Sequence, residues 1–382
     1  MKEGVMLLDE SKLEEKDFKY TYTEILNQAD TWLEVYNLYE KRKNDIENFL
    51  KKVGKDCKVI FTGAGTSEYV GNIALDYLKT HGEFEFESVA TTDLVSAPYL
   101  HFEKDQKTLL VSFARSGNSP ESLAAVKLGK QIVDDFYNLP ITCAKEGKLA
   151  QALKDDENSY VFLEPEITND KGFAMTNSFS SMLLATLLIF DTKTKNKKEI
   201  VDKISKLGKE IYNNLEEIEN LVNFDFNRVV YLGSGPLGKL TKEARLKILE
   251  LTAGEVATIW ESSMGFRHGP KSFVDENTLV ISFVSSNPYT RLYDLDILDE
   301  IANDKIAKKI IGISNSKLDR DYELIFEEDG LDDVYLCPAY IIIGQIIALV
   351  TSLRVGNTPD NPSRTHTVNR VVKGVTIHDY KN

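Results

Sequence analysis

The sequence has few cysteines, few histidines and no pattern typical of a metal site. Its three cysteines, Cys57, Cys143 and Cys337, are far apart and form no Cys-x-x-Cys pair. This excludes a disulfide framework and a zinc site, and it favours a reducing compartment. Cys143 and Cys337 lie in apolar runs that resemble strands, where a small buried side chain is expected. The five histidines show no ligand spacing, so we expect no metal and no other cofactor.

Long apolar runs are also scarce. The first 18 residues reach acidic side chains too soon for the apolar core of a signal peptide. The most apolar run, residues 340–350, is too short to span a bilayer and contains Gly344 and Gln345. We therefore expect a soluble, cytoplasmic protein.

Basic residues are fewer than acidic ones. Lys and Arg number 46 against 60 Asp and Glu, which gives a formal net charge of −14. Such a surface repels nucleic acid and anionic membranes, so neither is an expected partner. An anionic ligand would have to be held by a local site. The length of 382 residues, 42% of them hydrophobic, is ample for two domains.

Apolar segments that resemble strands alternate with helical segments, and the whole pattern occurs twice. The second occurrence follows the first at an offset of 170, so that Gly63 and Gly65 correspond to Gly233 and Gly235. The aligned segments are 58–80 with 228–250, 108–113 with 278–283, 140–144 with 310–314 and, after a small slip, 160–165 with 334–338. This repeat predicts an α/β protein with two duplicated domains, each a parallel, doubly wound, flavodoxin-like sheet flanked by helices.

The repeat and the polar stretch around residue 200 suggest domain limits. We expect an N-terminal helical segment (1–50), a first α/β domain (51–192), a linker or joining helix (193–210), a second α/β domain (211–355) and a C-terminal tail (356–382).

Small and hydroxyl residues follow two neighbouring strands of the first copy. They are Gly65, Thr66 and Ser67 after one strand, and Ser116, Gly117, Asn118 and Ser119 after the next. Both turns precede helices, whose N-terminal N–H groups favour an anion. The alternative is simple helix capping by the hydroxyl side chains. In the second copy, residues 285–289 contain no glycine and suggest no matching cradle.

Three ionisable residues share one stripe of a predicted helix. Glu243, Lys247 and Glu250 stand at i, i+4 and i+7. The neighbouring stripe, which contains Leu246 and Leu249, is the one expected to be buried. A carboxylate half-desolvated at this border, with a lysine to hold it ionised, could act as a general base. The alternative is a surface helix with ordinary ion pairs.

A turn follows this helix. Gly269 and Pro270 break any helix and would present the imidazole of His268, which titrates near neutrality. Residues 233–238 also fit the G-x-G-x-x-G dinucleotide pattern. No acidic residue closes a second strand there, so we interpret them as a strand-to-helix turn.

The turns at 63–67 and 116–122, together with the duplicated unit, resemble double SIS (sugar isomerase) proteins, which bind phosphosugars. Segments 243–273, 169–182 and 23–32 resemble the AgaS branch more specifically. Members of that branch are described as tagatose-6-phosphate ketose/aldose isomerases or galactosamine-6-phosphate deaminases. The resemblance covers nearly the whole chain.

The resemblance also implies roles for individual residues. By comparison with the isomerase half of glucosamine-6-phosphate synthase, Glu250 would move a proton between C1 and C2, assisted by Lys247. His268 would open the sugar ring from the neighbouring subunit, which implies a homodimer with shared active sites. Lys373 would lie in a tail that closes over the sugar. Arg115 departs from the synthase pattern and is expected to contact the phosphate or a hydroxyl.

The expected activity is that of an enzyme, an amino-sugar phosphate deaminase/isomerase. It would convert galactosamine 6-phosphate to tagatose 6-phosphate and ammonia. Three alternatives stay open: a tagatose-6-phosphate ketose/aldose isomerase acting on a hydroxyl sugar, a non-catalytic phosphosugar-binding SIS protein, and a deglycase for fructosamine phosphates, which would need a larger pocket.

Overall fold

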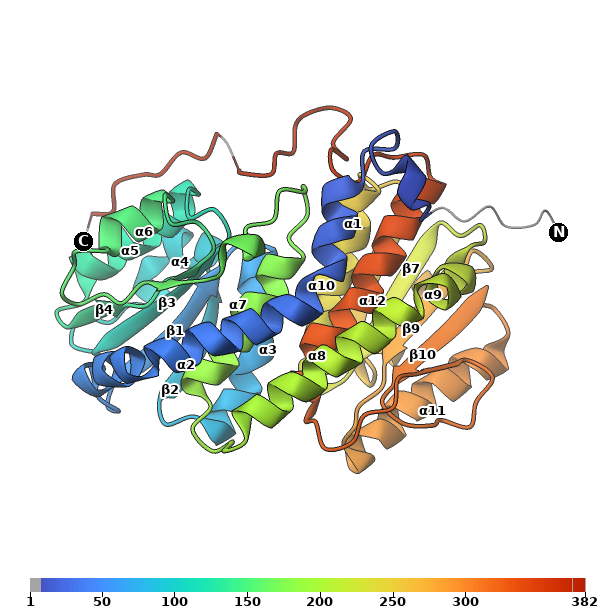
Figure 1. Ribbon diagram of the computed structural model, residues 1–382, viewed down its shortest axis with the longest axis horizontal. Helices are drawn as coiled ribbons and strands as arrows, with labels where there is room; N and C mark the ends of the chain where they lie inside the picture. The colour runs from blue at the N-terminus through green and yellow to red at the C-terminus, as the bar shows by residue number, and fades with distance from the viewer. Residues whose placement is uncertain (1–7, 373, 382) are drawn as a thin grey trace. The chain divides into compact units, whose positions relative to one another are not determined.

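The computed structural model describes residues 8–372 and 374–381, which divide into two compact units (Figure 1). The first-sheet unit comprises Asp30–Asp170, Asn177–Lys198 and the tail from Val368. The second-sheet unit comprises the chain up to Ala29, Lys171–Thr176 and Glu199–Thr367. Both units are discontinuous in sequence. The domain limits inferred from the sequence stay a prediction.

The first-sheet unit is built on a parallel sheet with the strand order β2-β1-β3-β5-β6, in which β4 also pairs with β3. The strands are β1 (Lys58–Gly63), β2 (Glu85–Ala90), β3 (Thr108–Ala114), β4 (Phe136–Asn138), β5 (Ile141–Thr142) and β6 (Phe162–Leu163). The helices are most of α2 (Gln28–Val53), then α3 (Thr66–His81), α4 (Thr91–Ser96), α5 (Pro120–Ile132), α6 (Lys148–Leu153) and α7 (Asn177–Phe190), with short 3₁₀ turns η2 (Pro98–Leu100) and η3 (Glu166–Thr168). Every residue of β3 is buried, as expected for a central parallel strand covered on both faces.

The second-sheet unit repeats this order. Its five parallel strands run β11-β10-β9-β7-β8. They are β7 (Arg228–Gly233), β8 (Ala257–Ser262), β9 (Thr278–Phe283), β10 (Lys309–Ser314) and β11 (Glu323–Ile325). The helices are α1 (Lys19–Leu26), nearly all of α8 (Lys197–Asn213), α9 (Leu215–Val222), α10 (Gly235–Leu251), α11 (Pro288–Asp304) and α12 (Asp333–Arg354), with 3₁₀ turns η1 (Glu10–Lys12), η4 (Gly265–Arg267) and η5 (Pro270–Phe273).

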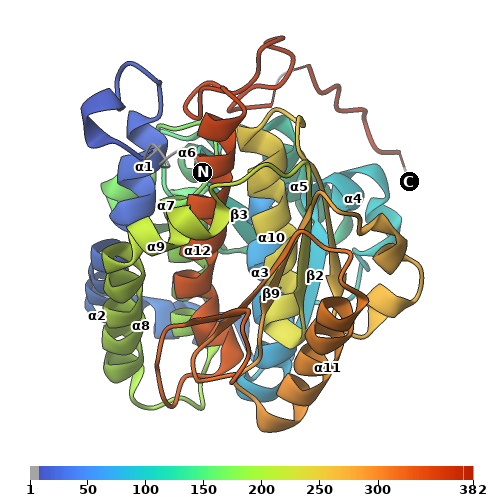
Figure 2. The ribbon, with the colours of Figure 1, turned by 90° about the vertical axis from the view of Figure 1, so that its right-hand side faces the viewer.

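Helices cover both faces of the second sheet (Figure 2). On one face, Ile297 and Leu298 of α11 pack against Val230 and Val280. On the other, the ring of Tyr340 from α12 stacks on Phe283. This three-layer arrangement confirms the predicted doubly wound fold.

The structure confirms the internal repeat with one correction. β1 and β7 begin at Lys58 and Arg228, and β3 and β9 begin at Thr108 and Thr278, so both pairs keep the offset of 170. The prediction that 334–338 forms a strand matching 160–165 is wrong. Residues 334–338 lie in the first turns of α12, and the counterpart of β6 is β11. A continuous apolar run does not distinguish a buried strand from a buried helix.

The same correction applies to Cys337, which is buried in α12, whereas Cys143 directly follows β5. Helix α12 extends well beyond the run 340–350 noted in the sequence. Among the described residues it is the one helix whose length and composition would allow a membrane span, with a mean hydropathy of 2.0. That stretch is 100% buried within the protein. Helix α12 is therefore a core element, packed against α10 where Gly344 meets Ala244.

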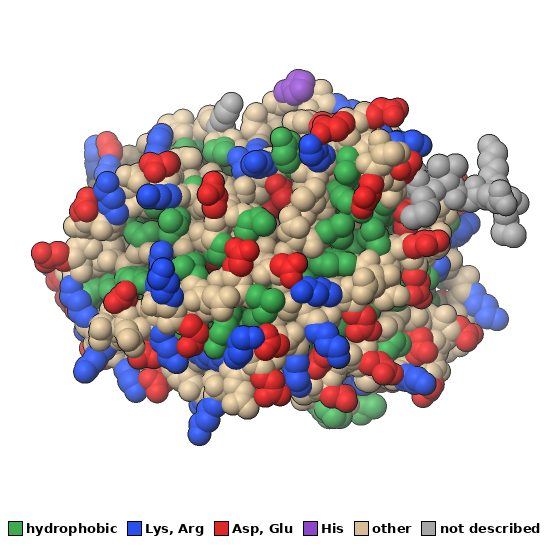
Figure 3. All heavy atoms as spheres, in the orientation of Figure 1, with side chains coloured by type: hydrophobic (Ala, Val, Ile, Leu, Met, Phe, Trp, Pro, Cys, Tyr) green, Lys and Arg blue, Asp and Glu red, His purple; other side chains and the backbone are tan. Residues whose placement is uncertain are grey.

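On the face drawn in Figure 3, basic and acidic side chains are interspersed with apolar ones. A local site, rather than a broad field of one sign, must therefore attract any charged ligand to this face.

Candidate active site

The first predicted turn lies at the carboxyl end of β1 and leads into α3. Gly65 has φ of 57° and ψ of −127°, a conformation that favours glycine. A Cβ on Gly63 would lie 2.4 Å from the carbonyl carbon of Ser67, so the backbone of the turn folds closely on itself. Thr66 and Ser67 are the first two residues of α3, and both are buried. The turn therefore places backbone N–H groups of a 16-residue helix at this edge of the sheet.

The second turn lies beside the first, because β3 pairs directly with β1 in the same parallel sheet. Ser119 is the N-cap of α5, and its Oγ accepts a hydrogen bond from the Ser122 N–H at 3.3 Å. Asn118 Oδ1 accepts from the Lys148 N–H at 3.1 Å. Helix capping thus occurs here, as the alternative interpretation expected, and it leaves Ser116 half-buried beside Gly117 with φ of 61°.

Arg115 is buried at the end of β3 and is fixed by the C-terminal tail. Its Nη2 donates to the carbonyl oxygen of Arg370 at 2.8 Å. The guanidinium of Arg370 in turn donates to the carbonyl oxygen of Asp170. Asp170 accepts hydrogen bonds from the N–H groups of Asn177 and Ser178 at 3.1 and 3.0 Å, which caps the N-terminus of α7. The tail segment at Arg370 therefore lies against the cradle. Lys373, expected in this tail, lies outside the described residues.

The predicted ionisable stripe is confirmed as part of helix α10. Lys247 lies between two carboxylates, with its Nζ 3.2 Å from Glu243 Oε1 and 2.6 Å from Glu250 Oε2. The side chains of Lys247 and Glu243 are 0% exposed, whereas that of Glu250 is 24% exposed. Burial alone would lower the pKa of Lys247, but the two carboxylates outweigh it and raise the pKa, so the ammonium is charged at neutral pH.

This burial corrects the sequence analysis in one respect. The ionisable stripe is itself the buried face of α10, and Leu246 and Leu249 are only half-buried. The surface-helix interpretation is therefore wrong. A buried lysine needs compensating charge, which Glu243 supplies from inside and Glu250 from the edge. Glu250 is the member of the group that solvent or a ligand can reach.

His268 lies in the short segment between η4 and η5. Its backbone N–H donates to the carbonyl oxygen of Gly265 at 2.9 Å, and Gly269 follows with φ of 120°. The side chain of His268 is exposed. Within the described part of the chain no hydrogen bond or ion pair is recorded for its imidazole, so the ring is available to an outside group.

The second-sheet unit has two carboxylates where the first-sheet unit has its second turn. Asp294 of α11 accepts hydrogen bonds from the hydroxyls of Ser234 and Ser263, each at 2.5 Å, and from the Ser285 N–H at 2.9 Å. Asp333 accepts from the Ser285 hydroxyl at 2.5 Å and from the N–H and hydroxyl of Ser286, each at 2.7 Å. The donors at this edge of the second sheet are thus used by the chain's own anions.

The cradle and the α10 group belong to different units, and each is defined here within its own unit. The model of the SIS domain matches residues 54–191. D-galactosamine-6-phosphate deaminase AgaS of Escherichia coli is 40% identical over 95% of this chain and 96% of its own length. The chain belongs to the AgaS family of SIS-domain proteins.

Solved structures agree with this family. A structure from Clostridium novyi NT matches with a TM-score of 0.93 and 42% identity, covering 97% of this chain and 98% of that one. The tagatose-6-phosphate ketose/aldose isomerase of E. coli matches with a TM-score of 0.88 and 38% identity, covering 95% of this chain and 97% of that one. The AgaS-family chain therefore has relatives named for both of the activities considered from the sequence.

Sequence reasoning missed several polar residues of this AgaS-family chain. Asp294 and Asp333 accept hydrogen bonds from residues up to 60 positions away in the sequence, and no local motif marks them. Asp170 lies in the segment 169–182 and Arg370 in the C-terminal tail, but their contacts were not predicted. One signal was present for Asp294. It is the seventh residue of α11, and the seventh residue of α5 is the apolar Val126. A comparison of the two copies beyond their turns would have shown this difference.

Proposed function

We propose that this protein is an amino-sugar phosphate deaminase that converts galactosamine 6-phosphate to tagatose 6-phosphate and ammonia. The observation that carries the proposal is the carboxylate of Glu250, partly exposed and held at 2.6 Å by the buried ammonium of Lys247. An ionised carboxylate at the edge of a buried charge group is suited to moving a proton between neighbouring carbon atoms. The AgaS relatives named as galactosamine-6-phosphate deaminases support the choice of substrate.

In the proposed reaction the substrate phosphate binds to the turns at 65–67 and 115–119. His268 moves a proton between O5 and O1 and so opens the ring. Glu250 removes the proton from C2 and returns it at C1, which leaves an imine at C2. Water then adds to C2, and ammonia leaves to give the ketose. One water is consumed for each ammonia released.

Lys247 acts through Glu250 in this proposal. Its Nζ is fully buried between two carboxylates, and its ion pair holds the carboxylate of Glu250 in place. Arg115 contributes positive charge next to the second turn, where the carbonyl oxygen of Arg370 fixes its guanidinium. Lys373, which the resemblance places near the sugar, would stabilise negative charge that develops on the open-chain substrate.

We further propose a cytoplasmic homodimer in which His268 serves the active site of the partner subunit. The exposed imidazole supports this arrangement, as does the exposed side chain of Met264 four residues earlier. The tail from Val368, which already contacts the cradle at Arg115, would close over the bound sugar.

A second candidate is a plain tagatose-6-phosphate ketose/aldose isomerase. The E. coli structure with that name, 38% identical to this chain, favours it. The same acid–base residues would act on a sugar with a hydroxyl at C2, and no ammonia would form. The two candidates differ in the substituent at C2 and not in the proton transfer.

The decisive experiment measures ammonia release from galactosamine 6-phosphate by the purified protein, with glucosamine 6-phosphate in parallel. Rapid release from the galacto sugar alone is expected. Release from the gluco sugar alone would overturn the substrate assignment. If neither sugar gives ammonia, the deaminase proposal is wrong, and interconversion of tagatose 6-phosphate with its aldose would then test the second candidate.

A further inference from the structure

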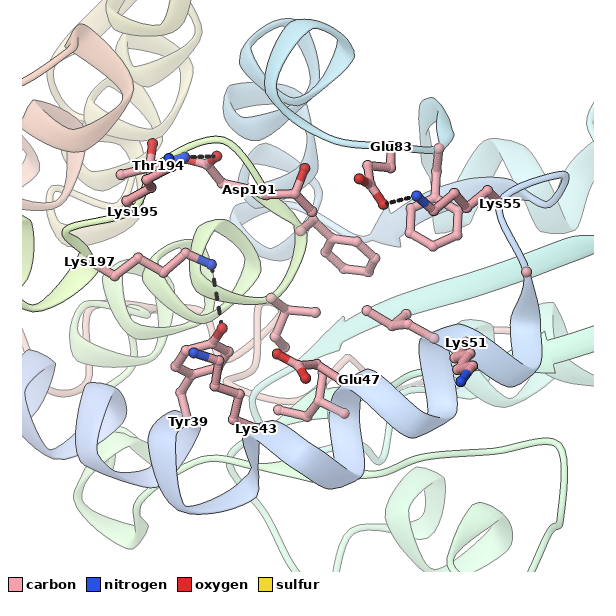
Figure 4. A pocket seen from close by; sticks show the side chains of 17 residues that line it. Tyr39, Lys43, Glu47, Lys51, Lys55, Glu83, Asp191, Thr194, Lys195 and Lys197 are labelled. Carbon is pink, nitrogen blue, oxygen red and sulfur yellow. Dashed lines mark hydrogen bonds and ion pairs between the residues drawn. The ribbon is translucent and has the colours of Figure 1, made fainter.

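A pocket lies in the first-sheet unit near the amino ends of the strands, whereas the proposed phosphate cradle lies at their carboxyl ends. Its cavity volume is about 580 Å³, within the usual range for small-molecule sites. Three segments form it: the second half of α2, the turn that precedes β2, and the connection from α7 to α8 (Figure 4). Because the cradle follows the carboxyl ends of β1 and β3, the length of a strand separates the two sites.

The walls of this pocket offer an apolar surface. Ile46 of α2 and Phe190 at the end of α7 are almost fully buried, and Leu50 and Phe84 are half-buried beside them. The ring of Tyr39 adds an aromatic face. Such a lining favours a ligand with an apolar body rather than a bare inorganic ion.

The rim of the pocket is positively charged, in contrast to the protein as a whole. Among its lining residues are five lysines (Lys43, Lys51, Lys55, Lys195 and Lys197) and three acidic residues (Glu47, Glu83 and Asp191), an excess of two positive charges in a chain of net charge −14. Glu83 is paired with Lys55 at 2.7 Å. One carboxylate oxygen of Asp191 accepts hydrogen bonds from the N–H groups of residues 193 and 194, each at 3.0 Å.

Of the other four lysines, Lys43 pairs with Glu40 at 3.8 Å, and for the other three no ion pair is recorded among the described residues. The Nζ of Lys197 donates to the carbonyl oxygen of Leu188 at 2.6 Å and lies 3.4 Å from the hydroxyl of Tyr39, toward which it points in Figure 4. Burial lowers the pKa of Lys197, so an added anion would stabilise its charged form. Within the described residues no ion pair is recorded for Lys51 or Lys195, which come from two different walls of the pocket.

We propose that this pocket binds a small organic anion, with an aromatic or aliphatic body on the apolar wall and its anionic group at the lysines of the rim. The shared chemistry is an apolar body with a carboxylate, sulfonate or phosphate ester. The ligand would contact residues 191–197, directly before the point at which the chain passes from the first-sheet unit to the second-sheet unit, between Lys198 and Glu199. This places the pocket where a metabolite can act on the joining segment without competing for the cradle.

The test uses the fluorescence of 8-anilinonaphthalene-1-sulfonate, titrated against the full-length protein. Saturable binding at one site per chain is expected. Substituting Lys51→Glu and Lys195→Glu together should weaken that binding by about tenfold or more, because two attractions become two repulsions at short range. The matched control is Lys41→Glu. Lys41 is an exposed residue of α2 outside the pocket and should leave affinity unchanged.

Two further arms define the ligand class. Leu50→Trp fills part of the apolar wall and should also weaken binding of the probe. Octanoate should displace the probe, whereas inorganic phosphate at the same concentration should not. Equal affinity in the Lys51/Lys195 variant and the Lys41 control would overturn the proposal, as would the absence of saturable binding. Displacement by phosphate as effective as that by octanoate would overturn the apolar part. None of these measurements depends on ammonia release, so their outcome is independent of the proposed function.

Discussion

The two sheets of this protein share one topology and differ in the polar groups at the carboxyl ends of their strands. In the first-sheet unit the turns after β1 and β3 present glycine, serine and the start of two long helices at one edge of the sheet. In the second-sheet unit the carboxylates of Asp294 and Asp333 occupy the hydroxyl and N–H donors after β7 and β9. We propose that the duplicated fold keeps one edge for an external anion, whereas internal carboxylates close the other.

With its strand ends occupied by Asp294 and Asp333, the second-sheet unit would have a role other than anion binding. Its α10 carries the buried Glu243–Lys247 pair and, next to it, the partly exposed Glu250. Binding and proton transfer would then be divided between the copies. This division can be tested by changing one copy at a time, beginning with the change of largest expected effect.

The first prediction separates chemistry from binding. Replacing Glu250 by Gln removes the proposed base and keeps its shape, and we expect turnover to fall by about 10³-fold or more. Affinity for the sugar phosphate, measured by calorimetry, should stay within about twofold because the cradle belongs to the other copy. Glu255→Gln on the exposed segment after α10 serves as the control. Substantial residual turnover in the Glu250 variant would remove this residue from the mechanism.

The second prediction concerns the buried charge group of the second copy. Lys247→Met leaves two carboxylates without their ammonium, and we expect a loss of about 3 kcal/mol in the free energy of unfolding. Denaturant titration measures this loss, with Lys239→Met on the same helix as the control. The double variant Glu243→Gln/Lys247→Met should recover part of the loss. If the double variant is as unstable as the single variant, the unpaired carboxylate of Glu243 is not the cause of the lost stability.

The third prediction uses a buried carboxyl of the first copy. Burial raises the pKa of Glu164 to about 8, an effect that Arg42 only partly opposes. The folded protein therefore keeps a proton that the unfolded chain releases near its ordinary value of 4.5, and stability falls as pH rises toward 8. Relative to the parent protein, the free energy of unfolding of the Glu164→Gln variant should rise by roughly 2 kcal/mol between pH 6 and pH 8. This follows because a difference of one bound proton between the folded and unfolded states changes that free energy by about 1.4 kcal/mol per pH unit.

Unfolding midpoints of the two proteins at pH 6, 7 and 8 measure this gain. The exposed Glu146, changed to Gln, is the matched control and should show no such trend. Parallel stability curves for the parent and the Glu164 variant would contradict the prediction.

The fourth prediction places a carboxylate, like that of Asp294 in the second copy, at the matching position of the first copy. Counted from the first residue of each helix, Val126 of α5 corresponds to Asp294 of α11, and Asp is close to Val in size. We expect Val126→Asp to weaken sugar-phosphate binding by about tenfold, because a carboxylate near the cradle repels the phosphate and competes for its donors. Val126→Asn controls for the loss of an apolar contact. Equal affinity in the two variants would show that charge at this position does not reach the cradle.

The sequence was sufficient for the repeated sheet, the turns and the α10 stripe, because glycines, capping residues and helical spacing are local signals. The sequence was insufficient where hydrogen-bond partners lie outside the local motif. Asp333 lies 48 residues from Ser285, and Asp170 lies seven residues before the α7 terminus that it caps. It also misassigned the start of α12, since an all-apolar run has no period to distinguish helix from strand. The burial of Glu243 and Lys247 depends on how α12 packs against α10, and no pattern within α10 itself reveals it.

Each compact unit is assembled from three separate stretches of chain, and the chain passes between them at five points. The first-sheet unit is incomplete until residues after Val368 have been made, and the second-sheet unit needs the first 29 residues as well as those up to Thr367. Neither half can therefore be separated by one cut of the chain or finished early during synthesis. A fragment that ends near residue 198 would lack the C-terminal tail, whose Arg370 carbonyl oxygen accepts a hydrogen bond from Arg115. A fragment that begins near residue 198 would lack α1. Each copy is thus completed by a stretch that the chain supplies only after it has passed through the other copy.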